Sequence, residues 1–203
     1  MINEEMLEKL RVGVSSVMSD RRFRHTLGVE AVARKLSKIW LPERTWEIAA
    51  AAILHDVSKE MPEDVQRELI LESDPSFPEE DLQCIPALHS FSAPYVVKRD
   101  FPIFATEDII SSIGKHTLGD AEMSVFDEII FLADFIEESR TYPNAVLTRN
   151  FVLGSIESGE TAIEILHKGC VMEIDSTIAC LVKQGKKVNE KALLAKTGIL
   201  LKI

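Results

Sequence analysis

The sequence contains little of what extracellular and membrane proteins use to fold. Its 203 residues include three cysteines (Cys84, Cys170 and Cys180), which form no C-x-x-C pair. No apolar run reaches the roughly 18 residues that a membrane span needs. The N-terminus is acidic and has neither the basic start nor the apolar segment of a secretory signal. We therefore expect a cytoplasmic protein with no membrane partner, whose cysteines are buried and reduced.

Positive charge is also in short supply. The chain has 23 lysines and arginines against 33 acidic residues, a formal net charge of −10. Its densest basic stretch is only Asp20-Arg21-Arg22-Phe23-Arg24. Nucleic-acid polymers are bound by concentrated basic surfaces, so we expect no such partner. An acidic protein that acts on an anionic small molecule needs local positive charge, which a bound metal can supply.

Glycine and strand-like patterns are scarce as well. There are nine glycines, and the alternation of apolar and polar residues typical of strands is almost absent, whereas helical periods dominate. The length favours one domain over two. The sequence therefore predicts an all-α fold that forms a single compact domain over residues 1–203.

Capping residues and prolines divide the chain into expected helices. We expect a first helix over residues 3–18 and a second that Asp20 caps and Leu41-Pro42 ends. A third helix should run over residues 46–59 with Thr45 as its cap, and a fourth should have Pro62 in its first turn. Residues 74–78 are expected to form a loop, and short helices to surround His89 and His116, with breaks at Pro102 and Gly119. Ser124 and Asp127 resemble a capping box that opens a helix to about residue 138. Two or three helices should follow Tyr142-Pro143.

Two of the expected helices are apolar on every side and still carry an aspartate. Residues 48–54 are entirely apolar and lead into His55-Asp56, while residues 129–133 lead into Asp134. A carboxylate in such surroundings costs free energy unless its charge is compensated. A metal ion, a buried arginine or backbone donors could each do so, and for either aspartate alone these alternatives stay open.

The histidines favour the metal. Four of the five lie in or beside expected helices, at His25, His55, His89 and His116; His167 has no motif around it and is expected to be an ordinary helix residue. One histidine on an apolar face is more often a core residue than a ligand. Four of them together with two buried carboxylates are hard to place separately in a core of this size.

The ligand types and their number indicate two ions. Imidazoles with carboxylates suit Fe, Mn, Co, Ni or Zn. Six ligands exceed the shell of one catalytic ion that keeps an open position. Adjacent side chains point about 100° apart on a helix, so His55 can hold one ion while Asp56 bridges to the other.

The order of these residues resembles a known superfamily. His25, then His55-Asp56 and then Asp134 match the H…HD…D signature of the HD superfamily of metal-dependent phosphohydrolases, and His89 and His116 are what its dinuclear members add. The sequence around these residues resembles the bacterial YqeK family in four short segments: residues 24–29, 54–59, 115–117 and 131–137. The similarity is strong over about residues 20–150, and residues 151–203 are expected to be a helical extension of the same domain.

The resemblance implies an activity and a role for each residue. It implies a hydrolase that cleaves diadenosine tetraphosphate symmetrically into two ADP at a di-iron centre, through a hydroxide that bridges the ions. The first ion would be held by His25, His55, Asp56 and Asp134, and the second by Asp56, His89 and His116. Asp56 and Lys59 are the expected catalytic residues. Lys59, Arg140, Arg24 and Thr117 are the expected substrate contacts, and Lys59 would share a helical face with His55 and Asp56.

Differences from the family pattern concern the nucleotide pocket and not the ligands. Ser90 replaces a usual glycine, Glu138-Ser139 precedes Arg140 where Pro-Gly is common, and residues 119–122 are more acidic. Another HD phosphohydrolase (a nucleotidase or a phosphodiesterase), a non-catalytic nucleotide sensor and a helical scaffold are therefore alternatives. The presence of all six ligands favours an enzyme.

The apolar C-terminal stretch could cover the chain's own core or form a homodimer.

Overall fold

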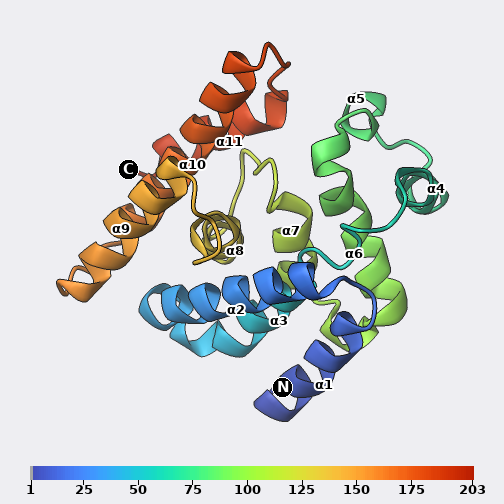
Figure 1. The fold of residues 1–203 in the computed structure, drawn as a ribbon, viewed down its shortest axis with the longest axis horizontal. Helices are drawn as coiled ribbons and strands as arrows, with labels where there is room; N and C mark the ends of the chain where they lie inside the picture. Colours follow the sequence, from blue (N-terminus) through green and yellow to red (C-terminus); the bar gives the residue numbers. More distant parts are fainter. Residues whose placement is uncertain (1) are drawn as a thin grey trace.

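Helices account for all the regular secondary structure over residues 2–203, the part of the chain that the computed structural model describes (Figure 1). The α-helices are α1 (Glu4–Ser15), α2 (Asp20–Trp40), α3 (Thr45–Leu54), α4 (Glu63–Ser73), α5 (Glu79–Leu82), α6 (Leu88–Asp100), α7 (Glu107–Lys115), α8 (Val125–Ile136), α9 (Pro143–Glu157), α10 (Ile163–Lys183) and α11 (Glu190–Leu200). Short 3-10 helices precede α3 and α6 and follow α6, at Pro42–Arg44, Ile85–Ala87 and Pro102–Phe104. The predicted all-α fold is confirmed.

The capping box predicted for α8 is present. The Ser124 side chain accepts a hydrogen bond from the backbone N–H of Asp127, and the Asp127 side chain accepts one from the backbone N–H of Ser124. Pro143 occupies the first turn of α9, where its missing N–H costs nothing. Gly119 has a positive φ of 71°, which makes it the break expected after His116.

Two other predicted caps are wrong. The cap of α2 is Ser19, whose hydroxyl accepts from the backbone N–H of Arg22, and Asp20 is the first helical residue. Thr45 is likewise the first residue of α3, and its hydroxyl donates to the Pro42 carbonyl instead of capping. In both cases the helix begins one residue from the predicted position: Ser19 makes the cap at α2, and α3 has no side-chain cap.

The third helix ends earlier than predicted. α3 stops at Leu54, and residues 55–60 form consecutive turns, with i to i−3 hydrogen bonds such as Val57 N to Leu54 O at 3.0 Å. The hydroxyl of Ser58 donates to the His89 carbonyl at 2.9 Å, which fixes the turn segment against α6. His55 and Asp56 therefore lie at the end of a buried helix rather than within it.

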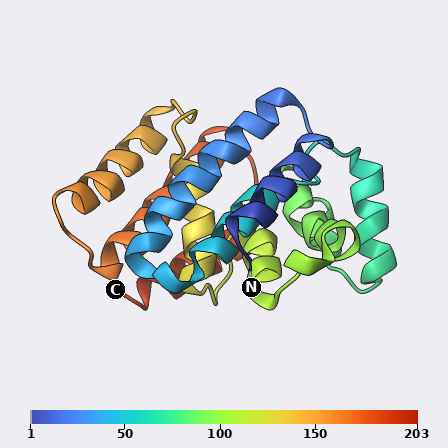
Figure 2. The same ribbon diagram turned by 90° about the horizontal axis from the view of Figure 1, so that it is seen from below.

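The core is built around α8 and α3. α8 packs against α2, α3, α7 and α10 and lies in the middle of the molecule in both views (Figures 1 and 2). Residues 48–54 of α3 are fully buried, and burying each of its Ile and Leu side chains contributes about 1.5–3 kcal/mol. One apolar cluster joins α1–α3, α6–α11 and the segments between them, and a small second cluster of Ile70, Leu82 and Leu88 joins α4 and α5 to α6. The chain therefore forms a single compact domain.

The cysteines are free thiols, as predicted, but their predicted burial is confirmed only for Cys170. Cys170 is buried, Cys84 is half-buried and Cys180 is exposed. Cys180 lies near the end of α10, on the part of that helix where most side chains face solvent. Within residues 2–203 no helix combines the length and apolar character required to cross a membrane.

Candidate metal centre

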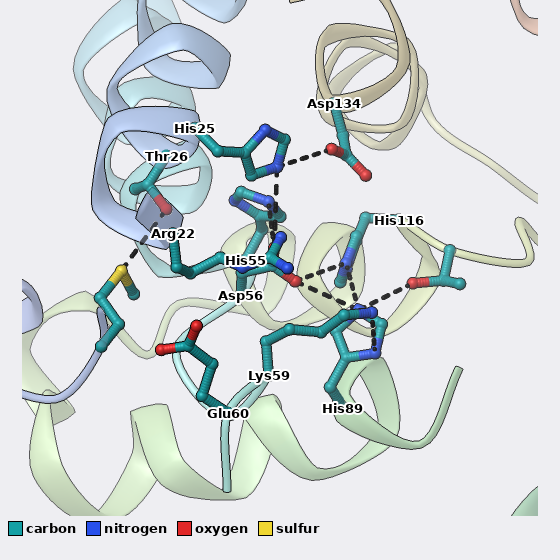
Figure 3. Close-up of polar contacts among 12 residues, drawn as sticks. Arg22, His25, Thr26, His55, Asp56, Lys59, Glu60, His89, His116 and Asp134 are labelled. Carbon is teal, nitrogen blue, oxygen red and sulfur yellow. Dashed lines mark hydrogen bonds and ion pairs between the residues drawn. The ribbon is translucent and has the colours of Figure 1, made fainter. Parts of the chain in front are cut away.

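The six predicted ligands converge from five segments of the chain (Figure 3). They are His25 of α2, His55 and Asp56 in the turns after α3, His89 in the first turn of α6, His116 directly after α7, and Asp134 of α8. All are buried except Asp134, whose side chain is 19% exposed. Helices α2, α3, α7 and α8 pack together, and this packing brings residues 109 positions apart in the sequence into one cluster.

Asp56 lies at the middle of this cluster. Its Oδ2 is 3.3 Å from His55 Nε2 and 3.7 Å from His25 Nε2. Its Oδ1 is 3.2 Å from His89 Nε2 and 3.7 Å from His116 Nε2. The two oxygens of one carboxylate thus face two different pairs of imidazoles, which is the arrangement of a bridging ligand.

Two overlapping sets of donor atoms could each hold an ion. His25, His55 and Asp134 form one set and His55, Asp56 and His116 the other, with all donors of a set within 4.8 Å of one another. His89 adjoins the second set, since its Nε2 is 3.1 Å from His116 Nε2. His55 belongs to both sets and stands between them.

The imidazoles are oriented for metal binding. The Nδ1 atoms of His55 and His116 each lie 2.7 Å from a backbone carbonyl, that of Ala52 and that of Ile113. A carbonyl only accepts, so each Nδ1 carries the proton and each Nε2 directs a lone pair into the cluster. His55 Nε2 is fully buried and has no hydrogen-bond partner among residues 2–203. A divalent cation would supply the missing partner, so the residues fit a metal centre.

The ring of His25 is held by a side chain instead of a backbone carbonyl. His25 Nδ1 lies 3.0 Å from Glu137 Oε1, and Glu137 Oε2 accepts a hydrogen bond from the backbone N–H of Ser139 at 2.7 Å. A methyl group at Gly28 would lie 2.6 Å from Glu137 Oε2, so glycine leaves room for this carboxylate. Burial opposes a charge on His25, but Asp134 and Glu137 outweigh it and raise the pKa of His25 to about 9. The same carboxylates favour a metal cation at this position.

Basic side chains surround the cluster. Arg140 donates to Asp134 Oδ1 at 2.5 Å, and Lys59 Nζ lies 3.0 Å from His89 Nδ1, so both predicted contacts reach the site. The hydroxyl of Thr117 is 3.2 Å from His89 Nε2. Arg24 is exposed and is not brought to the cluster.

Arg22 takes the place that was expected for Arg24. Its guanidinium donates to Asp56 Oδ2 at 2.7 Å. Arg22 precedes His25 by three residues and therefore shares its helical face, a signal in the sequence that could have identified it. Glu137 was also missed as a functional residue, although it follows Asp134 by three positions.

The surroundings of Asp56 and His89 keep these two ligands in the forms that bind metal. Burial lowers the pKa of His89 to about 4, so its ring is neutral at pH 7. Burial acts to raise the pKa of Asp56, but the surrounding imidazoles outweigh it and hold that pKa well below its usual value. Burial also lowers the pKa of Lys59. Metal ligation requires ionised carboxylates and neutral imidazoles, which is the state of Asp56 and His89. At His25 the neighbouring carboxylates favour a positive charge, which a metal cation would supply in place of the proton.

A polar cavity opens at the His25 side of the cluster. Its volume is about 340 Å³. The residues that line it include His25 and the basic and aromatic side chains of Arg21, Arg22, Arg140 and Tyr142. It therefore combines an edge of the metal cluster with three arginines, which suits a phosphorylated ligand.

The fold and the cluster together define an all-helical domain built around a histidine–aspartate centre. The family model described as the HD domain matches residues 22–138, and the chain belongs to this family. It is accordingly a hydrolase of the HD-domain kind. The resemblance to the HD superfamily that the sequence predicted is confirmed.

Relatives with stated activities match over most of the chain. A protein from Halalkalibacterium halodurans, named symmetrical bis(5'-nucleosyl)-tetraphosphatase, is 29% identical over 188 residues, which cover 91% of each chain. A Bacillus subtilis protein of the same name is 28% identical over 86% of this chain and 87% of its own. A solved structure from Clostridium acetobutylicum, described as a predicted HD superfamily hydrolase involved in NAD metabolism, has a TM-score of 0.83 and 24% identity over 97% of both chains. This last similarity concerns the fold alone.

Proposed function

We propose that this chain hydrolyses diadenosine tetraphosphate symmetrically into two ADP with the help of two divalent metal ions. The observation that carries the proposal is the position of Asp56, whose two carboxylate oxygens face two separate pairs of imidazoles. The names and extensive coverage of the relatives support the choice of substrate.

The ligands divide between two ions in this proposal. His25, His55, Asp56 and Asp134 hold the first, and Asp56, His89 and His116 hold the second. Ions at these positions supply Lewis acidity toward phosphoryl oxygens and lower the pKa of water, which is the chemistry that hydrolysis at phosphorus requires. We infer iron from the family resemblance; Mn, Co, Ni and Zn suit the same ligands.

The side chains around the centre bind and orient the polyphosphate. Arg22 and Arg140 each pair with a ligand carboxylate and line the polar cavity, so their remaining donors can grip phosphoryl oxygens. Lys59 lies beside His89 at the other side of the centre and can neutralise charge that develops on the departing phosphate. Thr117 can donate a hydrogen bond there. The cytoplasmic location and a homodimer remain predictions.

Metal and product analysis on the same preparations tests the proposal. Protein purified without oxygen should contain close to two ions per chain and should convert diadenosine tetraphosphate into ADP as the only nucleotide product. Asp56→Ala should lose both the metal and the activity, because Asp56 is a ligand of both ions in the proposed division. Asp64→Ala, which changes an exposed aspartate of α4, is the matched control and should keep metal and activity.

Each alternative gives a different result. Bound metal with turnover of another nucleotide but no ADP from diadenosine tetraphosphate would retain the HD phosphohydrolase and reject this substrate. Bound nucleotide without turnover of any phosphoester would indicate a sensor. Absence of metal together with absence of any turnover would contradict the proposed function as a whole.

A further inference from the structure

A second cavity shares no lining residue with the cavity that the arginines line. Its volume is about 380 Å³, and it is enclosed by α5, α8, α10, α11 and the segment that follows His116. In Figure 1, α5 and α11 both lie in the upper part of the view, and α8 lies below α11 near the middle. Its walls are mostly apolar, from Leu118, Phe131, Ile174 and Leu181. The functional residues described so far use this space only at Thr117.

The cavity adjoins the metal cluster at two points. Thr117 lines it, and the Thr117 hydroxyl is 3.2 Å from His89 Nε2. Pro86 also lines it, and the Pro86 carbonyl accepts a hydrogen bond from Lys59 Nζ at 3.4 Å. The polar cavity instead contains His25. The His25 and His89 sides of the centre therefore open into two different cavities.

The lining of the second cavity suits a ligand with a flat ring, polar ring edges and negative charge. Apolar walls suit the faces of a flat ring, while Thr177, Gln83 and Asn189 offer hydrogen-bonding groups for its edge. Lys186 and Lys187 stand at the rim, with Lys187 paired to Glu80 at 2.8 Å, and supply positive charge near the opening. The volume is in the range of small-molecule sites, about 300–1,000 Å³. A nucleoside with phosphates attached combines a flat ring, polar edges and negative charge.

We propose that this cavity binds the nucleobase and ribose of one half of a dinucleoside polyphosphate, with the phosphates passing Thr117 to reach the metal centre. The inference rests on the proposed function, because a symmetrical cleavage requires a nucleotide half on each side of the reacting phosphates. The polar cavity with Tyr142 then receives the other half. The two halves of the substrate are identical, but the two cavities that receive them differ in polarity.

A bulky side chain inside the cavity tests this inference. Ile174, Thr177 and Leu181 lie on one face of α10 and line the cavity. Thr177 is exposed, so Thr177→Trp should fold while its indole fills part of the space. Ala179→Trp is the matched control, since Ala179 is exposed on α10 two residues away and is not among the lining residues. Leu181→Trp is a second blocking variant.

The measurements are the KM and kcat of the metal-loaded enzyme for diadenosine tetraphosphate and the affinity for ADP by calorimetry. We expect Thr177→Trp to raise KM by about tenfold or more and to change kcat less. An effect of this size corresponds to losing part of the binding free energy of one buried ring. The ADP affinity or stoichiometry should fall in parallel, and Ala179→Trp should match the wild type.

The inference and the proposed function can fail separately. If the wild type hydrolyses diadenosine tetraphosphate and both folded blocking variants keep its KM and ADP affinity, the cavity assignment is overturned and the function stands. If the wild type binds ADP without hydrolysing diadenosine tetraphosphate, and Thr177→Trp abolishes that binding, the cavity assignment stands and the function falls. A wild type that binds neither nucleotide overturns both.

Discussion

The rings of His25, His55 and His116 are each held at Nδ1 by a different acceptor. Backbone carbonyls hold His55 and His116, and no substitution can remove them. His25 depends on the side chain of Glu137, which is buried and is itself positioned by Ser139. Partners of this kind set the orientation of a ligand and raise its basicity, and they contribute to metal affinity almost as the ligands do.

We predict that Glu137→Gln weakens metal binding about 10- to 100-fold, the usual effect of losing such a partner. The amide keeps the shape of the side chain but removes the negative charge that favours a cation at His25. Competition with a chelator of known affinity measures the change. Because Glu137 contacts no substrate in this proposal, the metal-saturated variant should recover most of its kcat.

The neighbouring residue provides the control for this prediction. Glu138 is exposed and makes no hydrogen bond or ion pair within residues 2–203. Glu138→Gln makes the same chemical change one position away and should leave metal affinity unchanged. Equal losses in both variants would mean that long-range charge, rather than the contact with His25, determines the affinity.

The two aspartates could be predicted from the sequence because each is an anomaly at an apolar helix, whereas the histidines were predicted from their number and from their order along the chain. A carboxylate or an imidazole among apolar neighbours is costly without a partner, so the local sequence alone indicates that a partner exists. Arg22 and Glu137 are not anomalous in this way, because arginine and glutamate are ordinary on helix ends. Their contacts with Asp56 and His25 depend on the packing of α2 against α3 and α8, and the sequence shows only that each lies three residues from a predicted ligand.

At the scale of secondary structure, helix starts were easier to predict than helix ends. The capping box at Ser124 is a local hydrogen-bonding pattern that involves only residues 124–127. The end of α3 has no such local signal, because no glycine or proline follows Leu54 until Pro62. The contact between Ser58 and the His89 carbonyl, 31 residues away, fixes the turns instead. The helix propensities of the local residues cannot predict a contact with a residue so far away in the sequence.

We predict that Ser124→Ala lowers the free energy of unfolding by about 1 kcal/mol, as is typical for loss of a side-chain cap. The substitution leaves the backbone N–H of Asp127 at the start of α8 without its acceptor. Urea denaturation of the metal-free protein measures the change without a contribution from ligand binding.

A cap position without a side-chain bond is the comparison. Thr106 is the cap residue of α7, and its side chain makes no capping hydrogen bond. Thr106→Ala should therefore change the stability by much less than Ser124→Ala. A Thr106→Ala loss as large as that of Ser124→Ala would show that backbone conformation, and not the hydrogen bond, stabilises these helix starts.

At the scale of the whole molecule, the C-terminal helices are joined to the metal-binding part by buried polar contacts. Glu128 of α8 is fully buried and pairs with His167 of α10 at 2.6 Å and with Lys202 beyond α11 at 2.6 Å. His167, which the sequence presented as an ordinary helix residue, thus belongs to a structural ion-pair network. The all-α class could be predicted from periodicity, but the pairing of α8 with α10 could not, because it depends on partners far apart in the sequence.

Glu173 is the member of this interface whose charge is not compensated. It lies on α10, it is buried, and in the part of the chain that the structure describes its Oε2 has no hydrogen-bond partner. Burial, reinforced by the charge of Asp134, raises the pKa of Glu173 well above its usual value. The folded protein therefore holds this proton to a higher pH than the unfolded chain does. As pH rises from about 4.5, the unfolded state releases the proton first, so Glu173 makes the fold progressively less stable until its folded-state pKa is passed.

We predict that Glu173→Gln is more stable than the wild type at pH 8, and that the difference shrinks toward pH 5. Glutamine keeps the size of the side chain and cannot ionise, so it removes this pH-dependent cost while leaving the packing of α10 on α8 in place. The free energy of unfolding from urea titrations at both pH values measures the effect. Glu164→Gln, an exposed change on the same helix, should show no comparable trend. If Glu173→Gln destabilises the protein equally at both pH values, the prediction is wrong. The carboxylate would then have a stabilising partner in solution, and its charge would not destabilise the interface between α8 and α10.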